Sequence, residues 1–171
     1  MRKFINVLAF QAGWFAAVLG AAHHMPWLSV VIVPLVLALR LALAPDWRPE
    51  LLLALGAAIV GFVFDTVLVS AGVYSPVPFL FPPPLSPLWM VLLWVNFATT
   101  LNASLGFLRG RYLLSAVFGA IGGPMAYYSG ARLGAIFEIP ATINLIILAI
   151  AWAITVPFLV FLSSKIIRQQ R

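Results

Sequence analysis

Few side chains in this sequence could do acid–base or metal chemistry: four are acidic, two are histidines and none is a cysteine. Asp65 stands out among them because it interrupts a long apolar run, where an ionisable group is costly and by default functional. Gly61 lies one turn earlier on the same helical face, so another helix or a ligand can approach. Asp65 is therefore expected to be either a buried tie between helices or a carboxylate that carries a proton or binds a ligand.

Other polar residues fall at depths in the apolar runs that are compatible with Asp65. Arg132 could reach Asp65, grip a phosphate or carboxylate of a ligand, or extend to the membrane interface. Amides within apolar helices also commonly hydrogen-bond to neighbouring helices. We therefore predict either such ties or a polar pocket that opens outward. The candidate ligand-binding residues are Asp65, Arg132, Tyr127, Tyr128, Asn96, Trp89, Asn144 and Gln11.

Signatures of known catalytic and metal sites are missing from the sequence. Adjacent residues on a helix point about 100° apart, so His23 and His24 form a poor chelating pair. There is no glycine-rich phosphate loop and no pair of carboxylates at catalytic spacing. We predict no metal and no cofactor, assign no catalytic residue, and leave open whether the protein is an enzyme.

Composition indicates an integral membrane protein. Of 171 residues, 64% are hydrophobic and only 8% charged, and the mean hydropathy is +1.10. A soluble domain carries about 25% charged residues. A soluble enzyme and a disordered chain are therefore excluded. The net charge of +6 does not indicate nucleic-acid binding, because the charges fall in short loops beside apolar runs.

Six apolar runs are long enough to be read as transmembrane helices. The sequence thus predicts an all-α, polytopic fold, a single six-helix bundle over residues 1–171. The expected spans are 4–22, 27–44, 50–72, 86–107, 112–132 and 140–163. The uncharged loop 73–85 holds five prolines and three aromatic residues. We expect it to lie on the outer membrane surface, either as a lid over the pocket or as a spacer.

Basic residues indicate the orientation, because cytoplasmic loops are enriched in lysine and arginine. Only Arg132 falls on one side of the predicted bundle. The other side holds Arg2, Lys3, Arg40, Arg48, Arg109, Arg111, Lys165, Arg168 and Arg171. This asymmetry predicts a bacterial inner-membrane protein with both termini in the cytoplasm. Small residues surround most of 112–132, including Gly119 and Gly123, so we expect that helix to be central.

Three segments of the sequence resemble one protein family. They are FQAGWFAAVLGA at 10–21, NFATTLNASL at 96–105 and GAIGGPMAYYSGARLGA at 119–135. They are similar to a family of small bacterial membrane proteins known as domain of unknown function 2878. The resemblance covers essentially the whole chain and implies a link to fatty-acid modification. Ala17 stands where the family motif has a cysteine, which excludes a thiol role here.

Three functions fit these features. The first is the binding or carrying of a small amphipathic or lipid-like ligand in the polar pocket. The second is an enzyme, or an enzyme subunit, that modifies acyl lipids in the membrane. The third is a structural subunit of a larger membrane complex. The partners expected are membrane lipids, a small-molecule ligand, and a second membrane protein or another copy of the chain; no nucleic acid is expected.

Overall fold

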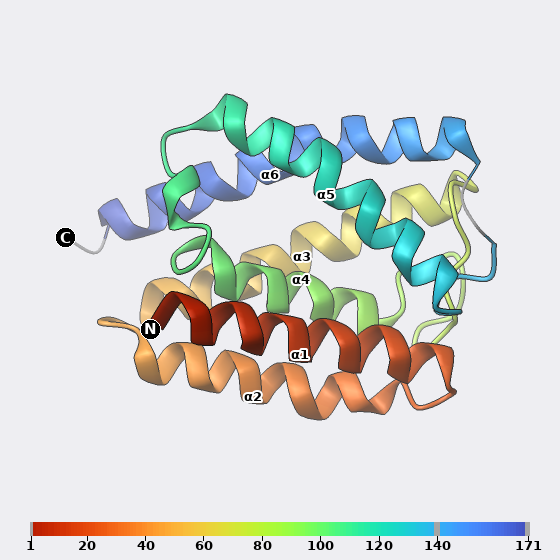
Figure 1. The fold of residues 1–171 in the computed structure, drawn as a ribbon, viewed down its shortest axis with the longest axis horizontal. Helices are drawn as coiled ribbons and strands as arrows, with labels where there is room; N and C mark the ends of the chain where they lie inside the picture. Colours follow the sequence, from red (N-terminus) through yellow and green to blue (C-terminus); the bar gives the residue numbers. More distant parts are fainter. Residues whose placement is uncertain (1, 139–140, 170–171) are drawn as a thin grey trace.

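The computed structural model describes residues 2–138 and 141–169, and within them the chain forms six α-helices. They are α1 (Arg2–Ala22), α2 (Trp27–Leu43), α3 (Arg48–Ser70), α4 (Leu88–Leu101), α5 (Tyr112–Arg132) and α6 (Thr142–Gln169). A short 3-10 turn, η1 (Gly106–Leu108), follows α4. The helices run lengthwise in one bundle, with the start of α1 and the end of α6 at the same end (Figure 1). The expected all-α class is confirmed.

The predicted helix 86–107 is too long, because α4 covers only Leu88–Leu101. Pro87 precedes it with an extended backbone and has no N–H to donate. At the other end the chain turns back, and the N–H of Leu105 donates to the carbonyl of Thr100 (2.9 Å). The side chain of Asn102, just beyond the helix, accepts a hydrogen bond from the guanidinium of Arg109 at 2.9 Å.

Three helices are long and apolar enough to cross a membrane: α1, α3 and Thr142–Arg168 of α6. The helices α2 and α4 are apolar but shorter. Large apolar side chains also point outward from the bundle, among them Ile59, Leu113 and Ile154, each more than half exposed. In water such a surface would be unfavourable. The protein is therefore membrane-associated.

The central helix is α4, not the glycine-rich α5 that the sequence favoured. No residue of α4 is exposed, and α4 packs against α1, α2 and α3. By contrast, α5 packs mainly against α6 and leaves Leu113, Ile121 and Met125 exposed. The prediction was wrong because α5 uses Gly119 and Gly123 for one close contact with α6, while other small residues face a cavity.

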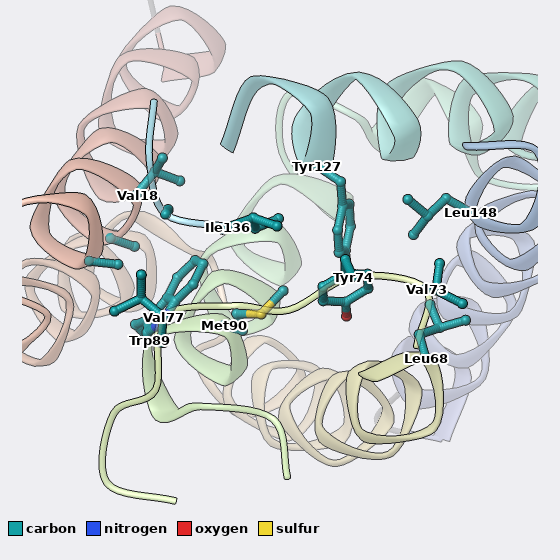
Figure 2. Packing of buried hydrophobic residues seen from close by; sticks show 13 residues of the cluster. Val18, Leu68, Val73, Tyr74, Val77, Trp89, Met90, Tyr127, Ile136 and Leu148 are labelled. Carbon is teal, nitrogen blue, oxygen red and sulfur yellow. The ribbon is translucent and has the colours of Figure 1, made fainter. Parts of the chain in front are cut away.

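The proline-rich loop 73–85 packs onto one end of the bundle. The N–H of Val77 donates to the carbonyl of Ala135 (3.0 Å), and the indole of Trp89 donates to the carbonyl of Val77 (2.8 Å). In Figure 2 the loop crosses beside Trp89 and Met90 and brings Tyr74 next to Tyr127. The loop therefore closes that end of the core and supplies one of its polar side chains.

Candidate functional site

Asp65 is fully buried on α3 and accepts hydrogen bonds from three other segments. Its Oδ1 accepts from the hydroxyl of Tyr74 on the loop at 2.7 Å and from the hydroxyl of Tyr127 on α5. Its Oδ2 accepts from the indole Nε1 of Trp94 on α4 at 2.8 Å. We call these four side chains the Asp65 network. It joins α3, α4, α5 and the loop at one point.

Tyr74 lies outside the helices, and its hydroxyl keeps its proton. Burial raises the pKa of the Tyr74 phenol well above its ordinary value, and the neighbouring Asp65 carboxylate raises this pKa further. A protonated phenol is the form that can donate to a carboxylate. The rings of Tyr74 and Tyr127 meet edge to face, with centroids 4.8 Å apart.

Trp94 can reach Asp65 because position 61 is a glycine. A Cβ on Gly61 would lie only 2.0 Å from the Trp94 ring, so any larger residue would displace the indole. The same ring stacks on Trp152 of α6 at 4.6 Å and 11°. Phe64 packs edge-on against both indoles. The expectation that Gly61 permits a close approach beside Asp65 is confirmed, and the approaching group is a helix side chain.

A cavity of about 610 Å³ lies beside the Asp65 network, between α1 and α5 and against α4. This volume is within the range of small-molecule sites. Most of its wall is apolar and includes Val7, Phe10, Leu93, Phe97, Phe118 and Met125. Its polar lining residues are Gln11, Asp65, Thr100, Ser104, Tyr127 and Ser129. Val7, Phe118 and Met125 are also exposed at its rim. The cavity is therefore open along the flank of the bundle.

The structure brings together four of the eight predicted binding residues. Asp65, Tyr127, Trp89 and Gln11 all line the cavity. Trp89 is almost wholly buried, and Gln11 is exposed on α1. They come from α3, α5, α4 and α1, so four helices contribute to one site.

The other four predicted residues lie elsewhere. Arg132 is exposed at the end of α5, and in the described part of the chain Asp65 pairs with hydroxyl and indole donors rather than with that arginine. Tyr128 points outward and is 42% exposed. Asn96 is buried between α4 and α1, where it donates to the carbonyl of Phe10 at 2.9 Å. Asn144 is half-buried on α6 and does not line the cavity.

Sequence reasoning missed three residues of the site: Tyr74, Trp94 and Trp152. Tyr74 entered only as one of the three aromatic residues of the loop 73–85, and neither tryptophan was singled out. Only Gly61 signalled a partner, since a small residue one turn from a buried carboxylate makes room for a donor. The sequence carried no signal for which of the six tryptophans would use that room.

Fold and site together define an all-helical, membrane-associated protein with an enclosed carboxylate beside a flank cavity. The chain belongs to the family described as protein of unknown function DUF2878, whose model matches residues 3–158. No curated protein and no solved structure matches the chain.

Proposed function

We propose that the chain is an integral protein of the bacterial inner membrane with six spans and both termini in the cytoplasm. Apolar side chains point outward on α1, α2, α3, α5 and α6, as lipid contact requires. Basic residues also gather where α1 begins, where α2 meets α3 and where α6 ends, and Figure 1 places these segments at one end. Their excess supports a cytoplasmic assignment for that end.

Labelling of single cysteines can test this orientation, because the chain has no native cysteine. Arg111 and Arg132 are exposed and stand at opposite ends of α5. We expect a membrane-impermeant maleimide to label Arg132→Cys in intact spheroplasts, and to label Arg111→Cys only after the membrane is disrupted. The opposite pattern would reverse the proposed orientation. Labelling of both variants in intact spheroplasts would contradict a span between them.

We infer that the protein binds a small amphipathic ligand in the flank cavity. The observation that carries this proposal is the cavity itself, which has an apolar wall, a polar depth at Asp65 and Tyr127, and an exposed amide, Gln11. A cavity open on a lipid-facing flank would admit a ligand sideways from the bilayer. An acyl or similar chain would lie against Phe10 and Phe97, with its polar group at Gln11.

One observation favours a second candidate, a structural subunit with no ligand of its own. Both oxygens of Asp65 already accept hydrogen bonds from protein side chains. This is the arrangement of a helix tie, which needs no ligand to satisfy the carboxylate. The two candidates differ in what occupies the cavity, so filling the cavity separates them.

Gly122 offers a way to fill the cavity without touching the Asp65 network. It lines the cavity, and a Cβ added there would meet nothing within 4 Å. We expect native mass spectrometry of wild-type protein, extracted gently with its own lipid, to show a discrete bound mass that Gly122→Phe loses. The neighbouring residue Ile121 is exposed and does not line the cavity. Ile121→Phe places the same ring about 100° around the helix, outside the cavity lining, and is expected to keep the bound mass.

A wild-type spectrum without a discrete mass would overturn ligand binding and favour the structural subunit. The same conclusion follows if Gly122→Phe retains the mass as fully as Ile121→Phe does. Thermal unfolding of both variants should remain close to wild type, because neither substitution falls at a close helix contact.

A further inference from the structure

A second cavity, of about 230 Å³, lies at the opposite end of the bundle from the proline-rich loop. It is formed by the first turns of α1, the last turns of α2 and the segment after α4. Arg2, Lys3 and Arg40 line it together with the amides Asn6 and Asn102. We propose that this cavity binds a phosphate group, as the head of an anionic phospholipid or as free phosphate. This site goes beyond the proposed function and does not depend on the flank cavity.

Arg40 is the buried cation of this site, and a neighbouring carboxylate holds it in position. Its side chain is only 11% exposed, and its Nη2 pairs with Glu50 Oε1 at 2.5 Å. Among the described residues, two buried donors here have no hydrogen-bond partner, Arg40 Nε and the cavity-lining Asn102 Nδ2, and one buried acceptor, Glu50 Oε2, also has none. Buried donors are seldom left unsatisfied, and a guanidinium can bind anions along more than one edge. Glu50 therefore fixes the guanidinium in place, and a ligand oxygen would satisfy the remaining N–H.

The charges around the cavity favour an anion. Glu50 offsets Arg40, which leaves Arg2 and Lys3, both exposed on the first turn of α1, to attract a negative group. Asp46, the carboxylate closest to Glu50 along the sequence, accepts a hydrogen bond from the backbone N–H of Arg48. The balance is therefore positive at the mouth of the cavity.

The remaining wall of the cavity fits a lipid better than a free ion. Ile5 and Ala9 of α1 face Val36, Leu39 and Leu43 of α2 across it. An anionic phospholipid would place its phosphate at the cationic mouth and the upper part of a chain between the two helices. Basic pockets between membrane helices are known to hold lipid head groups in this way.

The test uses full-length protein in detergent, titrated separately with phosphatidylglycerol, phosphatidylcholine and inorganic phosphate, with binding followed by native mass spectrometry. The double variant Arg2→Gln/Lys3→Gln removes the two charges at the mouth. The matched control Arg111→Gln/Arg168→Gln removes two exposed charges that do not line the cavity. We expect the first variant to weaken phosphatidylglycerol binding at least about tenfold, and the control to keep wild-type affinity.

Equal weakening in both variants would overturn the site, because it would show general charge attraction. Equal binding of phosphatidylcholine and phosphatidylglycerol by wild-type protein would also overturn it. Displacement of phosphatidylglycerol by millimolar inorganic phosphate would support the site and assign recognition to the phosphate alone. Failure of phosphate to displace the lipid would support the intact lipid as the ligand. Unchanged thermal unfolding of the double variant is the check that its effect is on binding.

Discussion

Replacement of Asp65 with leucine is expected to destabilise the folded protein by at least about 3 kcal/mol. The substitution would strand the hydroxyls of Tyr74 and Tyr127 and the indole N–H of Trp94, which all donate to this carboxylate. Each buried donor without a partner costs about 1–3 kcal/mol. Thermal unfolding in detergent, followed by circular dichroism, should show a large fall in the midpoint.

Asparagine at the same position separates lost hydrogen bonds from lost shape. Its single carbonyl oxygen can still accept from Tyr74 and Tyr127, whereas its NH2 group would face the Trp94 N–H. Asp65→Asn leaves the Trp94 N–H and its own NH2 group without an acceptor, so it should cost about 2–6 kcal/mol, less than the three stranded donors of Asp65→Leu. Asp46→Leu serves as the control, because Asp46 is exposed and, within the described part of the chain, its carboxylate accepts from the nearby backbone N–H of Arg48.

A further pair of substitutions tests the network directly. In the Asp65→Leu background, the added changes Tyr74→Phe and Tyr127→Phe remove two stranded hydroxyls and should recover part of the lost stability. In the wild-type background the same pair should be destabilising. The two tyrosine substitutions thus change the free energy of unfolding in opposite directions in the two backgrounds. This difference is the coupling that a double-mutant cycle measures. If Asp65→Leu unfolds at the wild-type temperature, or the cycle shows no coupling, the network does not hold the helices together.

The helices were predictable because lipid-exposed sequences carry a strong signal. Long apolar runs broken by prolines located all six, and α1, α2, α3 and α5 both begin and end within two residues of the expected limits. By contrast, α6 continues to Gln169, past the expected limit at 163. The end of α4 was missed because its limit is set by tertiary bonds. Asn102 accepts hydrogen bonds from Arg109, seven residues further along the chain, and from Ser163 of α6, and neither contact shows as a periodic pattern in the sequence.

The arrangement around α4 was not predictable from one sequence. A small-residue face shows that a helix is approached closely but not by how many neighbours, so α5 was wrongly placed at the centre. Similarly, a buried carboxylate demands donors, but Arg132, tyrosines and tryptophans can all donate. The structure uses Tyr74, Tyr127 and Trp94, since the loop and α4 bring these side chains to Asp65.

Gly119→Ala and Gly122→Ala are expected to change stability in opposite directions, although the two glycines lie three residues apart on one helix. A Cβ on Gly119 would lie 2.3 Å from the backbone oxygen of Trp152, which cannot rotate away. Overpacking of this kind costs about 1–3 kcal/mol. At Gly122 the added methyl meets nothing within 4 Å, so only the higher helix propensity of alanine remains, about 1 kcal/mol in favour of folding.

The same pair of variants shows whether the contact between α5 and α6 also holds the aromatic wall of the site. Gly119→Ala should push the Trp152 backbone away and disturb its stacking on Trp94, which in turn bonds to Asp65. The near-ultraviolet circular dichroism of these stacked indoles should therefore weaken in Gly119→Ala and persist in Gly122→Ala. Equal spectra and equal unfolding temperatures for the two variants would show that α5 and α6 are not packed closely at Gly119. A weakened signal would mean that a glycine on α5 keeps the donor to Asp65 in place through Trp152 and Trp94.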